Sequence, residues 1–113
     1  MTFLYQVRAV PPSAYVISVE GSIDAGTSIQ LDLALNGVLA NQAVLKIVFD
    51  LAKTTFISSS GLRLFMVASK AMSARRGKVM VVGEDRRISE AVTTAGMQKM
   101  LTFAPSVDDA LAL

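Results

Sequence analysis

Two short runs rich in β-branched residues constrain this fold more than any other feature of the chain. They are VLKIVF at residues 44–49 and KVMVV at residues 78–82, and a segment with helical periodicity follows each of them. A short, continuously apolar run is typical of a strand buried inside a parallel sheet. Strands that alternate with helices predict right-handed crossover connections and an α/β fold.

Residues on either side of these runs extend the pattern. Residues 3–10 and 14–20 are predicted to form two antiparallel strands joined by Pro11-Pro12-Ser13, with the first at the sheet edge. Apolar periodicity and capping residues predict further elements. They are helices at 25–40, 60–76 and 86–95, a strand near 100–103, and a last helix capped by Ser106. The predicted order is β-β-α-β-α-β-α-β-α, a mixed four- to five-stranded sheet in one domain spanning residues 1–113.

Two local expectations concern how these elements begin and end. Asp24 is expected to cap the first helix, in which one apolar stripe is formed by Ile29, Leu33, Gly37 and Ala40. A second set of apolar residues lies beside this stripe, namely Leu31, Leu35 and Val38. Asp50 is expected to end the strand at 44–49, and residues 51–59 are expected to form a loop.

The composition removes several kinds of chemistry. The chain has no Cys and no His, which excludes disulfides, thiolate nucleophiles, imidazole bases and cysteine or histidine metal sites. This favours a binding or switching module over an enzyme, and neither a cofactor nor a metal is expected. The enzymatic alternative is a serine activated by a lysine, as Ser59 with Lys70 or Lys53.

Charge is distributed unevenly along the chain. Residues 53–100 hold nine basic and three acidic residues, although the whole chain has a net charge of +2. Nucleic-acid binding is one interpretation of its basic residues, which include Arg75, Arg76, Lys78, Arg86 and Arg87. Since these residues are spread over several predicted elements with few aromatic residues among them, solvated helix faces are the favoured interpretation.

Neither a secretion signal nor a membrane segment is predicted. Residues 1–10 lack a basic start followed by a long apolar block. Lys46, Asp50 and Lys78 interrupt the most apolar stretches, so no run reaches the roughly 18 residues of a membrane span. We therefore expect a cytoplasmic protein without membrane insertion.

The segment FDLAKTTFISSSGLRLFM, at residues 49–66, contains three consecutive serines and a glycine before an apolar helix. Free backbone N–H groups and the positive end of the helix dipole surround a serine in this position. Such a site accepts a phosphate group with little strain. Serines before a helix also serve simply as N-caps, and this window alone favours that interpretation.

Five segments of the chain resemble the STAS domain, and in particular anti-sigma factor antagonists. They are EGSID (20–24), the segment from Asp50 to Leu62 with its closing SGL, GKVMVVG (77–83), TAGM (94–97) and SVDDAL (106–111). The resemblance covers essentially the whole chain, and the segments follow the order of the family.

The resemblance implies a protein switch. In the family, a serine kinase that is also an anti-sigma factor phosphorylates the motif D-(S/T)-(S/A)-G-(L/I), and a phosphatase reverses the modification. The unmodified antagonist binds this kinase and frees a sigma factor. The phosphoacceptor corresponds to Ser59, with Ser60 as the next candidate, and Gly61 and Leu62 match the motif directly. Asp24 corresponds to an acid that lies near the acceptor and the docked kinase.

Ser58 stands where the family has an aspartate. A serine hydroxyl can still accept a backbone N–H bond, but it supplies no charge. This departure supports an alternative, in which the chain is a STAS accessory subunit of a transport or lipid-trafficking complex and is not phosphorylated. A further open question is the helix after the serines. Its two apolar faces indicate either a buried helix or one with a surface for a partner.

Overall fold

Five strands form one sheet, in the order β1-β2-β3-β4-β5, in the computed structural model, which describes residues 3–83 and 85–113. The strands are β1 (Leu4–Val10), β2 (Ala14–Ile23), β3 (Lys46–Ile57), β4 (Lys78–Val82) and β5 (Thr102–Ala104). The helices are α1 (Ala25–Leu39), α2 (Ser59–Ala74), α3 (Arg86–Thr94) and α4 (Val107–Ala112). β1 is antiparallel to β2 and the other strands pair in parallel, so the predicted mixed sheet with an antiparallel edge is confirmed.

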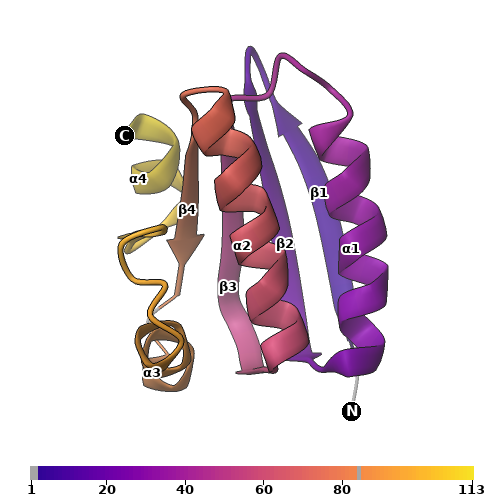
Figure 1. The fold of residues 1–113 in the computed structure, drawn as a ribbon, viewed down its shortest axis with the longest axis vertical. Coiled ribbons are helices and arrows are strands. Elements are labelled where there is room, and N and C mark those ends of the chain that lie inside the picture. The colour runs from indigo at the N-terminus through magenta and orange to yellow at the C-terminus, as the bar shows by residue number, and fades with distance from the viewer. Residues whose placement is uncertain (1–2, 84) are drawn as a thin grey trace.

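The helices cover the two faces of the sheet unequally. α1 and α2 lie side by side across one face (Figure 1), and α3 contributes Ile88 and Val92 to the same apolar core. Within this core the rings of Phe49 and Phe65 lie 4.7 Å apart between their centroids. α4 covers part of the opposite face, where the smaller cluster contains Val16, Val48, Met80, Val82, Ala104 and Ala110.

Two predicted strand ends were wrong. β3 does not stop at Asp50 but continues to Ile57, and β2 continues through Gly21 to Ile23. The two strands remain paired in parallel up to Ile23 and Ile57, with register shifts along the way. Thr54 is buried and its hydroxyl donates to the Val19 carbonyl at 2.9 Å. Pairing between distant segments thus keeps the polar stretch after Asp50 in the sheet, where a loop was expected.

The apolar stripe that begins with Ile29 and Leu33 is not the side of α1 that packs on the sheet. Ile29 and Leu33 are 64% and 69% exposed, whereas the neighbouring residues Leu31, Leu35 and Val38 are buried. Both sets of residues are apolar, so periodicity alone cannot select between them. Packing against β2 and α2 selects the second set and leaves Ile29 and Leu33 on the surface.

The ends of the helices are held by side chains from other elements. The Arg75 guanidinium, at the end of α2, donates to carbonyls at and after the end of α1, including that of Asn41 at 2.9 Å. Lys46 donates through Nζ to the carbonyls of Ala110 and Leu111 at 3.0 Å, which anchors the end of α4 to β3. None of the helices in the described residues is both long and apolar enough to cross a membrane.

Candidate functional site

The serine cluster lies where β3 passes into α2. Ser58 is the N-cap of α2, and its hydroxyl accepts from the Gly61 N–H at 3.2 Å, which confirms that a serine caps the backbone here. Its own N–H donates to the Ile23 carbonyl at 2.8 Å. This bond joins the start of α2 to the end of β2, so the position of the cluster is set by two strands and one helix.

Gly61 allows the first turn of α2 to pack directly on those two strand ends. A Cβ at this position would lie 2.6 Å from Ile23 Cγ2 and 2.8 Å from Ile57 Cγ1, well inside van der Waals contact. Any larger side chain would therefore push α2 away from the sheet, at a cost of about 1–3 kcal/mol. A glycine is therefore needed at this position for the start of α2, which carries the serines, to pack directly on the ends of β2 and β3. Leu62, the next residue, is partly buried and packs against the core.

Ser59 and Ser60 are exposed residues at the start of α2, and they line two different grooves. Ser59 lines the groove between the start of α2 and α3, which also contains Phe56, Leu62 and Arg87. Ser60 lines the groove between α1 and α2. That second groove is also lined by Ser28, Ile29, Asp32, Arg63, Leu64 and Val67. The two candidate acceptors therefore have different surroundings, which their adjacency in the sequence does not reveal.

Asp24 lies at the same end of the molecule, since it follows Ile23, whose carbonyl binds Ser58. It is the N-cap of α1, as predicted, and accepts from the Thr27 N–H at 2.8 Å. The Thr27 hydroxyl in turn accepts from the Asp24 N–H at 2.9 Å. These bonds form a capping box, in which the Thr27 N–H is the main cause that lowers the pKa of Asp24 below its usual value of 3.8. The exposed carboxylate is thereby kept charged beside the serine cluster.

Replacing Asp24 with Asn should make the stability of the domain less dependent on pH. Because folding lowers the pKa of Asp24, its charge stabilises the fold above the ordinary value of 3.8, and this contribution is lost as the pH falls through the lowered pKa. Asn keeps a cap oxygen without the charge. We expect wild type to have the higher urea midpoint at pH 7 and the two proteins to converge near pH 2. A difference of the same size at both pH values would contradict this.

An ion pair lies at the α3 side of the Ser59 groove. Arg87 donates to Asp85 through Nε at 3.0 Å and through Nη2 at 2.7 Å, and Asp85 also caps α3 by accepting from the Arg87 N–H at 2.8 Å. The guanidinium lowers the pKa of Asp85, and the carboxylate raises the pKa of Arg87. Glu90, one turn further along α3, also lines the groove, so the groove holds charges of both signs.

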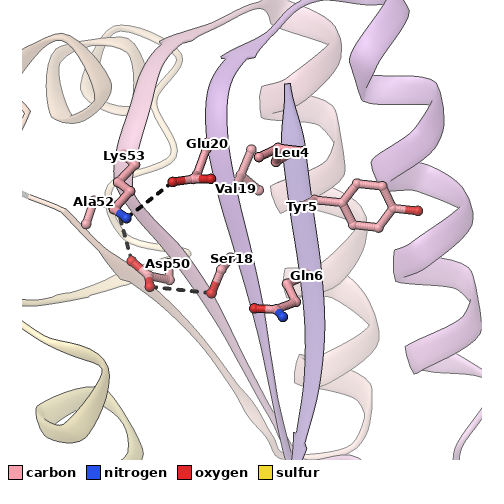
Figure 2. Close-up of a pocket in the computed structure, with 9 residues that line it drawn as sticks. All are labelled: Leu4, Tyr5, Gln6, Ser18, Val19, Glu20, Asp50, Ala52 and Lys53. Carbon is pink, nitrogen blue, oxygen red and sulfur yellow. Dashed lines mark hydrogen bonds and ion pairs between the residues drawn. The ribbon is translucent and has the colours of Figure 1, made fainter. Parts of the chain in front are cut away.

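Apart from the two grooves beside the serines, a hollow that we call the second hollow lies over β1, β2 and β3 (Figure 2). Ser18 and Glu20 alternate with core residues along β2, so they point to the sheet face opposite α1 and α2. Ser18 donates to Asp50 at 3.4 Å, and Lys53 pairs with Glu20 at 3.3 Å. The polar groups of this hollow therefore bind largely to one another, away from the serine cluster.

The geometry does not assemble the Ser–Lys pair considered above. Lys53 is paired with Glu20 in the second hollow. Lys70 follows Ser59 on the same helix, so the helical rise places it about 16 Å further along the axis. Among the described residues, no three acidic side chains gather closely enough to hold a metal ion.

Comparison with known proteins supports the observed fold. A family model, the STAS domain, matches residues 5–110. No curated protein matches the sequence. An anti-sigma factor antagonist from Mycobacterium paratuberculosis has a similar structure, with a TM-score of 0.85 and 26% identity over 98% of this chain and 92% of that one.

Three further structures are similar to this chain, and their described roles differ. The anti-sigma factor antagonist SpoIIAA in its unphosphorylated form has a TM-score of 0.84 and 18% identity over 96% of this chain and 93% of that one. The Bacillus cell fate determinant SpoIIAA in its phosphorylated form has a TM-score of 0.78, also at 18% identity, over 96% and 97%. A sulfate transporter family protein from Wolinella succinogenes has a TM-score of 0.71 and 18% identity over 93% and 87%.

The mixed sheet, the predicted element order and a serine cluster that opens α2 all occur together in one chain. The family model covers nearly the full length over which these features extend. On this basis the chain belongs to the STAS domain family.

Proposed function

We propose that this protein is an anti-sigma factor antagonist, a bacterial cytoplasmic protein whose binding to a serine-kinase anti-sigma factor is switched by phosphorylation of Ser59. The observation that carries the proposal is an exposed serine at the start of α2, flanked by grooves with exposed apolar side chains. The kinase would supply ATP. The Ser59 hydroxyl oxygen bonds to the γ-phosphorus, the bond from that phosphorus to the β-phosphate breaks, and the kinase takes the hydroxyl proton.

A docking surface for the kinase surrounds the serines. We define it by four exposed apolar residues, Ile29 and Leu33 of α1, Phe56 of β3 and Val67 of α2. Ile29 and Val67 line the Ser60 groove, and Phe56 lines the Ser59 groove. Exposed apolar side chains gathered around a polar site are typical of protein interfaces. On this proposal the protein acts by binding and catalyses no reaction itself.

Phosphorylation would change binding without unfolding the domain. A phosphate group adds a charge of roughly −1.5 to −2 at neutral pH. At the start of α2 the free N–H groups and the helix dipole tolerate that charge. Inside a closed interface the same charge must lose its hydration or meet the partner's acidic groups, which costs several kcal/mol. A phosphatase that hydrolyses the serine phosphate would restore binding.

The direct test is mass spectrometry of the protein recovered from its native cells. Trypsin releases residues 54–63 as one peptide, TTFISSSGLR, which contains all three serines. Fragment ions between Ser58, Ser59 and Ser60 assign the modified residue. We expect phosphate on Ser59 in a fraction of the molecules, and none on the same protein made in a foreign host. An unmodified peptide under every growth and stress condition would overturn the proposal.

The second candidate is a STAS accessory subunit of a transport or lipid-trafficking complex. It is favoured by Ser58, a neutral cap that stands where the family has an aspartate. The Ser58 hydroxyl accepts one hydrogen bond, from the Gly61 N–H, and supplies no charge. A structural neighbour in the sulfate transporter family is consistent with it. In this case the docking surface would bind a transporter component, and its affinity would not respond to the modification state of Ser59.

A further inference from the structure

The groove that Ser59 lines is also lined by a basic side chain. Arg87 lines the groove together with Ser59, and it is the basic residue among those that do so. α3 lies at the end of the molecule where α2 begins (Figure 1). An arginine presents a planar fork of donors that binds two phosphate oxygens at once. Ser59 therefore has a phosphate-binding side chain in its groove in addition to the N–H groups at the start of α2.

Arg87 is paired with Asp85, but the pair lies at the surface and the Arg87 side chain is mostly exposed. Its side chain is 68% exposed, whereas that of Asp85 is 26% exposed. The pair joins residues only two positions apart at the surface, and such pairs contribute little stability. A phosphate dianion carries more charge than a carboxylate and offers three acceptor oxygens. The greater charge of the phosphate favours its replacing Asp85 as the partner of Arg87.

Glu90 adds a reason for the exchange. Its carboxylate shares the groove with Ser59, so an added phosphate would meet a like charge there. Arg87 is placed to neutralise part of that repulsion. On the other side of α2, the charged groups that line the Ser60 groove are Asp32 and Arg63. A phosphate on Ser60 would therefore not face Arg87.

We propose that phosphorylation of Ser59 draws Arg87 from Asp85 to the phosphate, so that the modified serine is latched to the start of α3. This inference rests on the proposed modification of Ser59 and adds its internal receptor. The latch would hold the phosphate within the groove beside Phe56, at the docking surface, and would add a direct link between the start of α2 and the start of α3. The phosphorylated state is then a distinct arrangement of the groove as well as a more negative surface.

Phosphorus-31 NMR of a protein with phosphoserine installed at residue 59 during synthesis tests the latch. A neighbouring guanidinium lowers the second pKa of a phosphate below its usual value near 6. We expect Arg87→Gln to raise that pKa by about half a unit to one unit relative to wild type. Arg86→Gln is the matched control, because it removes the same charge from the adjacent position without changing the groove. Equal titration curves for the two variants would overturn the proposal.

A second readout does not depend on any substitution at Arg87. The pKa of Asp85 is lowered in the unmodified protein because Arg87 binds it. If Arg87 moves to the phosphate, the Asp85 carboxyl carbon should titrate at a higher pH once Ser59 is phosphorylated, and phosphoserine at residue 60 should leave it unchanged. An Asp85 titration that is the same in all three proteins would contradict the latch. Since the phosphate is installed without a kinase, these results are independent of whether cells modify Ser59.

Discussion

Replacing both Ile29 and Leu33 with Asp is expected to weaken binding to the proposed serine-kinase partner by about 100-fold, with little change in stability. The two side chains are 64% and 69% exposed, so the fold does not depend on them. They are one turn apart on α1, and Ile29 lines the groove that contains Ser60. Burying two carboxylates in an apolar contact costs about 1–2 kcal/mol each, and every 1.4 kcal/mol is a factor of ten in Kd.

The experiment is a titration of the variant against the kinase-type anti-sigma factor from the same genome, with the urea midpoint measured in parallel. The double variant Gln42→Asp/Ala43→Asp is the matched control. It adds two acidic side chains at exposed positions in the turn that follows α1. This turn lies at the C-terminal end of α1, whereas Asp24 and the serines lie at the N-terminal end. We expect wild-type binding from this control. If Ile29→Asp/Leu33→Asp also binds like wild type, α1 has no part in docking.

Phe65→Ala is expected to have the largest effect on stability, about 3–5 kcal/mol. The side chain is 1% exposed, and its ring packs on Phe49 at a centroid distance of 4.7 Å. Removing it leaves a cavity between α2 and β3, the two elements that meet at the serine cluster. A loss of this size is a large part of the total stability of a small domain.

Urea unfolding followed by circular dichroism measures the loss. Val67→Ala, two residues along the same helix, is the control, because Val67 is 39% exposed and lies outside the core clusters. Its effect is expected to stay within about 0.5 kcal/mol, as for most surface substitutions. A cost below about 1 kcal/mol for Phe65→Ala would show that the ring does not hold α2 on the sheet.

Features governed by local interactions were predictable from the sequence. The strand β4 matches its predicted bounds, since a short run of β-branched and apolar residues closed by Gly83 has few alternatives. Asp24 caps α1 and Ser106 caps α4 because each side chain binds a backbone N–H three residues away. The serine cluster was likewise placed at the start of α2, and Ser58 acts as its cap.

Features that depend on distant segments were not predictable in the same way. β3 continues past Asp50 because β2 offers a parallel partner as far as Ile23. Arg75 binds carbonyls at and beyond the end of α1, which no local pattern indicates. Arg87 and Glu90 belong to the candidate site because α3 lines the groove beside Ser59, a contact between segments far apart in the sequence.

The order of elements, the antiparallel edge and the position of the serines follow from the sequence alone, since they depend on residue spacing, turns and caps within a few positions. The tertiary structure alone decided which side of α1 faces solvent and which groove each serine lines. Ile29 and Leu33 are as apolar as Leu31 and Leu35, so only the approach of α2 and the sheet distinguishes the two sides. Ser59 and Ser60 are neighbours in the chain, but the turn of about 100° per residue in α2 directs one toward α3 and the other toward α1.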